Sequence, residues 1–195
     1  MKKMTISKIA LSVAINLAIC FTAIAQTNYS TKAVDIKLNG TSNLHDWEMK
    51  AVSGTSAASF VVTNGKVTSL SKMNFSVPAK NLKSGKSAMD KNTYKALKTN
   101  ANPNISFVLT SATVVSTGGN NYKINCQGKM SIAGKTNQTE LVATAIYNPA
   151  DKSFTVTGVK KMKMTEYNVK PPTAVLGTIK TGNDISISYN LKFKA

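Results

Sequence analysis

The stretch ISISYNLKFK, residues 185–194, decides the fold class. Isoleucine, tyrosine, leucine or phenylalanine occupies every odd position from 185 to 193, and serine, asparagine or lysine occupies every even one. Successive side chains of a strand point to opposite faces, so this pattern is typical of a sheet with one apolar face and one wet face. The stretch therefore predicts an amphipathic β-strand.

The same two-residue period recurs along most of the chain from residue 30 onward. Turn-forming sequences separate the alternating segments, and their short spacing favours antiparallel hairpins over crossover connections. The alternating segments include residues 34–38, 45–49, 73–77, 105–109 and 122–130. The predicted turns lie at Asn39-Gly40, Asn64-Gly65, 118–121, Gly134-Lys135, 148–151 and 182–184.

Residues 86–98 break the alternation and predict one short helix. Ser87 can serve as its N-cap, with Asp90 three residues later in a variant of the capping box. One helical face then carries Met89, Thr93, Ala96 and Leu97. We expect this helix to pack across an open end of the sheet.

The number of strands and the lack of other helices indicate how the sheet buries its apolar face. About eight strands with one apolar face each have nothing to pack against except themselves, and closure also removes exposed edges. We predict an all-β fold, an antiparallel up-and-down β-barrel of about eight strands with one short helix; a two-sheet sandwich is the alternative. The interior of such a barrel is either filled by side chains or holds one small ligand.

The first 25 residues have the order of parts of a secretory signal peptide. Three lysines precede an apolar run over residues 9–24, which ends in the small-residue cleavage site Ala23-Ile24-Ala25. The run is shorter than the ~20 residues of a membrane-spanning helix. We expect cleavage before Gln26, export to the periplasm, and one domain over residues 26–195. Lipoprotein processing at Cys20 is the alternative.

The charge of the chain is strongly positive and comes from lysine alone. The sequence has 25 lysines, no arginine and 8 acidic residues; three lysines lie in the leader, so residues 26–195 carry a formal net charge of +14. Arginine is the side chain that matches phosphates and base edges in a fork, so its absence argues against nucleic acid as a partner. A solvated surface, or transient contact with an anionic membrane, fits the spread of lysines better.

The chain offers little equipment for catalysis. Adjacent strand residues face opposite sides, so His45, the sole histidine, and Asp46 are not positioned as a catalytic pair. No nucleophile elbow, zinc-ligand set or phosphate loop occurs, and Cys126, the one cysteine after the leader, has the parity of a small buried residue. We expect no enzyme, no metal and no cofactor.

Several segments resemble the YceI-like family, particularly its Bacteroidetes-type members. The residues Gly40 to Trp47, GTSNLHDW, closely resemble the early G-T-S-T-L-H-D-W signature of that family. Further agreement lies in residues 82–85 with Met89, Tyr94 and Leu97, in residues 102–107, in residues 164–173 and in residues 177–182. The matches follow the family's order from about residue 30 to 193.

This resemblance implies a lipocalin-like, eight-stranded antiparallel barrel that is exported to the periplasm. It also implies a long apolar tunnel for a polyisoprenoid, an isoprenoid quinone or a similar amphiphile, and a binding or carrier role without catalysis. Members of the family differ in their ligands, so the resemblance does not identify the ligand of this chain. The alternative is a stress-associated structural or interaction module whose barrel is filled by side chains.

The side chains on the inward parity are the candidate ligand contacts. Flexible methionines among them suit a cavity that adapts to a chain-like guest. We place His45 and Tyr167 at the rim as contacts for a polar head group. The predicted interior set is Val34, Ile36, Leu38, Trp47, Met73, Phe75, Ile105, Phe107, Leu109, Tyr122, Ile124, Met130, Phe154, Val156, Met162, Met164, Ile187, Tyr189, Leu191 and Phe193.

Overall fold

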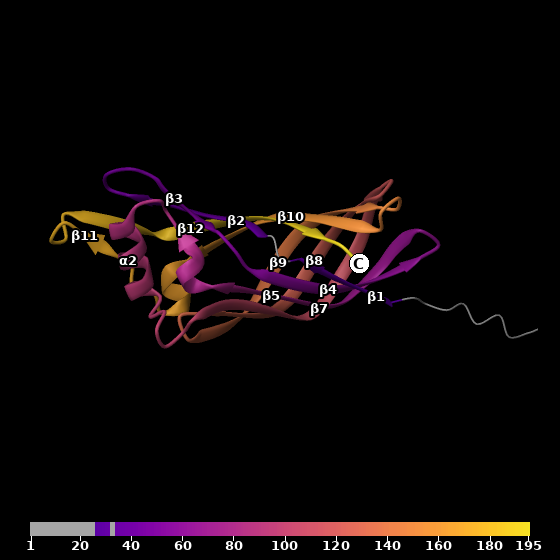
Figure 1. Cartoon of the computed structure of the whole chain (residues 1–195), viewed down its shortest axis with the longest axis horizontal. Helices are drawn as coiled ribbons and strands as arrows, with labels where there is room; N and C mark the ends of the chain where they lie inside the picture. The colour runs from indigo at the N-terminus through magenta and orange to yellow at the C-terminus, as the bar shows by residue number, and fades with distance from the viewer. Residues whose placement is uncertain (1–25, 32–33) are drawn as a thin grey trace, which may run out of the picture.

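The computed structural model describes residues 26–31 and 34–195 (Figure 1). The predicted signal peptide and Cys20 lie outside these residues. The strands are β1 (Gln26–Thr31), β2 (Val34–Ser42), β3 (Trp47–Ala51), β4 (Thr55–Thr63), β5 (Lys66–Pro78), β6 (Leu82–Lys83), β7 (Asn104–Gly118), β8 (Asn121–Ile132), β9 (Lys135–Asn148), β10 (Ser153–Lys163), β11 (Thr173–Ala174) and β12 (Ile179–Phe193). The helices are α2 (Ser87–Ala96) and the 3-10 turns η2 (Ala79–Asn81) and η3 (Met164–Tyr167).

The strands form one curled antiparallel sheet. Their order is β1-β4-β5-β7-β8-β9-β10-β12-β2-β3-β6, and β11 adds a short ladder to β12. From β7 to β10 each strand pairs with the next strand in sequence, as the short predicted hairpins require. The prediction of an all-β, antiparallel, up-and-down barrel is confirmed.

The described residues contain twelve strands, more than the eight predicted, because three positions around the barrel are each occupied by two strands and because β11 adds a short strand beside β12. The three pairs of strands are β1 with β2, β3 with β4, and β5 with β6. β1 is hydrogen-bonded to β4 and β2 to β3, and then β4 to β5 and β3 to β6. The circuit returns to its start where Ser30 and Lys194 exchange backbone hydrogen bonds of 3.0 and 3.3 Å. Counted around this circuit, the barrel has eight positions.

Two of the predicted turns are wrong, because a strand runs through each. Asn39 and Gly40 lie inside β2, where the absence of a Cβ at Gly40 makes room for the Trp47 ring. Residues 182–184 lie inside β12 and form a bulge, with a register shift between Thr181 and Ile185. At Asn64-Gly65, by contrast, both residues have positive φ and form the predicted tight hairpin.

The predicted helix is present as α2, at the end of the barrel that also carries β11 (Figure 1). Its predicted capping box does not form. Ser87 is the first helical residue, and the Asp90 carboxylate instead accepts bonds from the backbone N–H and the hydroxyl of Ser84, at 2.8 and 2.7 Å. No helix among the described residues is long and apolar enough to cross a membrane.

Packed aromatic side chains close the barrel at the end opposite α2. The rings of Phe60 and Phe154 stack with centroids 4.0 Å apart, and Tyr29 meets Phe154 edge-on at 5.0 Å. Phe193 and Tyr147 pack against the same pair. We call these five buried side chains the aromatic plug. Such pairs add about 0.5–1.5 kcal/mol each beyond the burial of their area.

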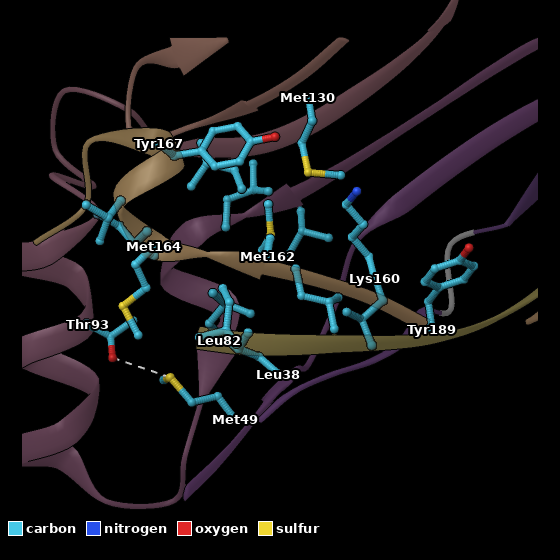
Figure 2. A pocket seen from close by; sticks show the side chains of 18 of the residues that line it. Leu38, Met49, Leu82, Thr93, Met130, Lys160, Met162, Met164, Tyr167 and Tyr189 are labelled. Atoms are coloured by element: carbon cyan, nitrogen blue, oxygen red, sulfur yellow. Dashed lines mark hydrogen bonds between the residues drawn. The ribbon is translucent and has the colours of Figure 1, made fainter. Parts of the chain in front are cut away.

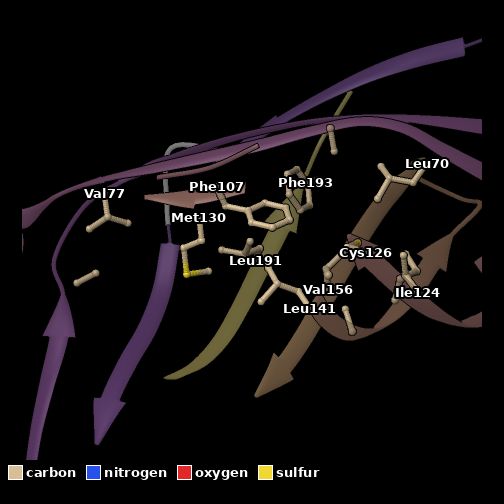
Figure 3. Packing of buried hydrophobic residues seen from close by; sticks show 14 of the residues in the cluster. Leu70, Val77, Phe107, Ile124, Cys126, Met130, Leu141, Val156, Leu191 and Phe193 are labelled. Carbon is tan, nitrogen blue, oxygen red and sulfur yellow. The ribbon is translucent and has the colours of Figure 1, made fainter. Parts of the chain in front are cut away.

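Between the plug and α2, the walls alternate as the sequence predicts. On β8, Ile124 and Cys126 are buried while Lys123 and Gln127 face solvent. Figure 3 shows Phe107, Leu141, Leu191 and their neighbours projecting into the shared interior. The predicted burial of Cys126 is confirmed, and burial raises the pKa of its thiol to about 11.

Candidate functional site: an apolar cavity in the barrel

The interior of the barrel is hollow. A cavity of about 460 Å³ extends from the plug to the α2 end. Phe60 and Phe193 of the plug lie at its floor, and exposed residues such as His45 and Val175 surround its mouth. The volume falls in the range of ~300–1,000 Å³ that is typical of ligand pockets.

Seventeen of the twenty-two predicted site residues line this cavity. They come from nearly every side of the barrel, because strands of alternating pattern turn the same parity inward. Their role in ligand binding stays a prediction. These residues are Ile36, Leu38, His45, Trp47, Met73, Phe75, Ile105, Ile124, Met130, Val156, Met162, Met164, Tyr167, Ile187, Tyr189, Leu191 and Phe193.

The other five predicted residues lie outside the cavity lining. Phe107 is fully buried and stacks on Phe75, with centroids 5.9 Å apart, and Phe154 belongs to the plug. The hydroxyl of Tyr122 accepts the backbone N–H of Val67 at 3.1 Å, where β5 no longer pairs with β7. The remaining two, Val34 and Leu109, pack against the core.

Helix α2 supplies part of the lining that the site prediction left out. The face that carries Met89, Thr93, Ala96 and Leu97 turns toward the cavity. The Thr93 hydroxyl lies 3.3 Å from the sulfur of Met49 on β3, which ties the helix to the wall (Figure 2). The sequence held a signal for this face, namely the helical spacing of its apolar residues.

The segment resembling the family signature builds one side of the mouth. The Trp47 ring lies over Gly40, and its Nε1 donates to the backbone oxygen of Thr41 at 2.9 Å. The Ser42 hydroxyl donates to the backbone oxygen of His45 at 2.7 Å and accepts the N–H of the same residue at 3.1 Å. These contacts give the segment a structural role in shaping the mouth.

Replacing Gly40 by alanine is expected to lower the free energy of unfolding by about 1–3 kcal/mol, because the new methyl group would overlap the Trp47 ring. Trp47 is the sole tryptophan, so its emission should shift to the red as the ring is displaced toward water. Urea unfolding followed by fluorescence measures the first effect. In a Trp47→Leu background the same substitution should cost much less; an equal cost would show that the ring is not the obstacle.

The two predicted rim residues differ in their exposure. His45 is exposed, and its Nδ1 lies 2.7 Å from the backbone oxygen of Asp46. Tyr167, on η3, is buried, and this burial raises the pKa of its hydroxyl. Both line the cavity, His45 at the mouth. In the described part of the chain no three His, Cys, Asp or Glu residues gather as metal ligands would.

Tyr189 lies beside the point where β9 and β10 stop pairing with each other. β9 and β10 pair only as far as Ala143 and Gly158, and beyond that point each pairs with its other neighbour alone. The Tyr189 ring lies over Gly158, and its hydroxyl donates to the backbone oxygen of Val142 at 3.0 Å. Burial raises the pKa of Tyr189 to about 12, so the hydroxyl keeps its proton and this hydrogen bond at neutral pH.

One lysine departs from the prediction that the lysines lie on the surface, either solvated or in contact with a membrane. Lys160 on β10 shares the inward parity of Val156 and Met162, is half-buried, and lines the cavity. Two further lysines, Lys86 and Lys163, touch the lining and are exposed. In the described part of the chain, the charged side chains that line the cavity are therefore all positive.

The fold and the cavity define a class: a small antiparallel β-barrel protein with an internal apolar site. The YceI-like domain model matches residues 40–193, so the chain belongs to the YceI-like family. This confirms the resemblance to the family; the Bacteroidetes type stays a prediction. A search of curated proteins finds no match.

Solved structures share the fold at low sequence identity. BcnA of Burkholderia cenocepacia is 17% identical, with a TM-score of 0.62, over 82% of this chain and 95% of BcnA. A polyisoprenoid binding domain from Saccharophagus degradans is 7% identical, with a TM-score of 0.63, over 88% and 99%. The Campylobacter jejuni YceI protein is 12% identical, with a TM-score of 0.54, over 72% and 81%. These similarities concern the fold.

Proposed function

We propose that this protein binds a long apolar amphiphile, such as a polyisoprenoid or an isoprenoid quinone, inside the barrel and carries it. The observation that supports this most is the apolar cavity of about 460 Å³ inside the barrel. The Saccharophagus degradans domain of similar fold is described as polyisoprenoid binding, which supports the same class of ligand here. The role is binding, without catalysis.

The energetics of such binding are favourable. Burial of one CH₂ group gains ~0.8 kcal/mol, so each five-carbon isoprene unit gains roughly 3–4 kcal/mol before ordering costs are subtracted. Methionines such as Met73, Met130 and Met162 line the wall, and their unbranched side chains adapt to the shape of a guest. A tail of a few isoprene units is thus sufficient for useful affinity.

The alternative role, an interaction module with a filled barrel, is less well supported. Side chains fill the plug end and leave the middle of the barrel hollow. A hollow apolar interior costs packing energy relative to a filled one. Its presence here therefore favours a guest.

Native mass spectrometry of gently purified protein tests the proposal. We expect an adduct of one apolar molecule per chain, which organic extraction removes and a long-chain isoprenoid restores. Binding of the added isoprenoid should also raise the unfolding temperature, because the ligand binds the folded state alone. Neither an adduct nor any uptake by the extracted protein would contradict the proposal.

Location and membrane contact belong to the same proposal. We propose export to the periplasm, tested by finding Gln26 without an acyl chain as the first residue of the protein from its host. We also propose brief contact with anionic lipid through the lysines, since residues 26–195 carry 22 lysines against 8 acidic residues. Co-sedimentation with anionic but not with zwitterionic vesicles tests this contact.

A further inference from the structure

Among the described residues, Lys160 is the one charged side chain that the barrel wall turns into the middle of the cavity. It sits directly opposite Ile187 of β12, and both residues line the cavity. Figure 2 shows its side chain extending between Met162 and Tyr189 toward Met130. These three neighbouring side chains are therefore apolar or aromatic. Lys160 lies further inside the cavity than His45 and α2, which form the mouth.

The ammonium group of Lys160 has no partner among the described residues. The ion pairs in that part of the chain are Lys50–Glu48 and Lys163–Asp184, both with exposed side chains. No hydrogen bond joins the Lys160 Nζ to another described residue. Within residues 26–31 and 34–195, no aspartate or glutamate lines the cavity.

An unpaired charge at such a place is costly for the protein alone. No acidic side chain offsets this charge, and an apolar side chain of similar length would pack as well. An ammonium group offers three donors and no acceptor, so its natural complement is an anionic oxygen. A guest that brings such an oxygen would form a short, charge-assisted hydrogen bond in a weakly screened site.

We propose that Lys160 binds the anionic head group, a carboxylate or a phosphate, of the amphiphile in the cavity. The apolar wall on either side of Lys160 then holds the tail, and Lys86 near the mouth attracts the anion. This inference rests on the proposed function and narrows its ligand from any apolar amphiphile to an acidic one.

The test compares Lys160→Met with Lys161→Met after removal of co-purified lipid. Lys161 is the next residue on β10, is exposed on the outer face, and loses the same charge in the same substitution. Titration calorimetry at neutral pH and low salt gives the affinity for three probes of one tail length: hexadecanoic acid, hexadecyl phosphate and hexadecan-1-ol.

We expect Lys160→Met to weaken binding of the acid and the phosphate by about 10-fold to 100-fold and to leave the alcohol within about 2-fold. Lys161→Met should leave all three probes within about 2-fold. The tighter of the two anionic probes in the unaltered protein identifies the preferred head group. Equal losses for acid and alcohol, or no loss for either, would overturn the role of Lys160.

A second measurement does not depend on the folding of the variant. When ¹³C-carboxyl hexadecanoic acid is bound to the unaltered protein, its carboxyl should titrate at a lower pH than the same group in a neutral micelle, since a nearby ammonium group stabilises the carboxylate. An unshifted or raised carboxyl pKa would contradict the inference. Unaltered protein that binds acid and alcohol equally refutes the head-group site alone, whereas binding of no probe refutes the proposed function as well.

Discussion

Replacing Phe154 by alanine is expected to lower the free energy of unfolding by about 3–5 kcal/mol. The side chain is fully buried at the centre of the aromatic plug, in contact with the rings of Tyr29, Phe60 and Tyr147. The substitution removes these ring contacts and leaves a void that the closed end of the barrel cannot easily fill. Urea unfolding at equilibrium measures the loss.

The matched control is Phe154→Leu, which keeps most of the apolar volume and loses only the ring contacts. It should cost roughly 1–2 kcal/mol. If the alanine variant cost less than about 1 kcal/mol, the plug would not be a packed element, and the barrel would be free to open at both ends.

Replacing Val156 by phenylalanine is expected to weaken binding of a long-chain amphiphile by about 30-fold. The added ring would project into the hollow and displace the equivalent of two to three CH₂ groups of a guest, at ~0.8 kcal/mol each. Val156 is 6% exposed and lines the cavity. The folded state should survive, because the ring enters empty space.

Val159→Phe is the control for this variant. Val159 lies on the same strand, is 57% exposed, and faces outward, so the same substitution there should leave affinity unchanged. Calorimetry with one isoprenoid probe compares the two variants with the unaltered protein. Undiminished binding by a folded Val156→Phe variant would place the guest somewhere other than this cavity.

The alternation of apolar and polar residues made the wall of the barrel predictable. Along β8 and β12 the side chains that the sequence turns inward are those that the structure buries or places against the cavity, as at Ile124 and Leu191. A period of two reports a local property of the strand, the face to which each side chain points. This period depends only on neighbouring residues, so it can be read from one sequence alone.

Depth along the barrel axis was not predictable in the same way. Phe154 and Val156 share one face of β10, yet the first belongs to the plug and the second lines the cavity. Depth depends on the stagger of neighbouring strands, which long-range pairing sets and no short sequence pattern reports. For the same reason Phe107 was predicted to line the cavity although it packs beside it.

Two further features were not predicted from the sequence, the inward position of Lys160 and the extended conformation of Asn39-Gly40. In both cases the usual behaviour of the residue type argued against the position that the residue occupies. Lys160 has the inward parity, but lysine is so commonly solvated that its parity was not used. Asn39-Gly40 has the composition of a hairpin turn, but Gly40 serves the close approach of the Trp47 ring. In each case the informative fact is a neighbour from elsewhere in the chain: the cavity that the other strands enclose around Lys160, and the Trp47 ring of the next strand at Gly40.

The aromatic plug limits how a ligand can enter and leave the barrel. Because the rings of Phe60, Phe154 and Phe193 fill one end of the barrel, a guest held in the cavity cannot pass out through that end. On the proposed function, such a protein takes up and releases its ligand without passing it through the barrel from one end to the other. Loading and unloading would therefore be separate docking events at the α2 end of the barrel. The part of the ligand that enters last would be the first to reach the receiving membrane.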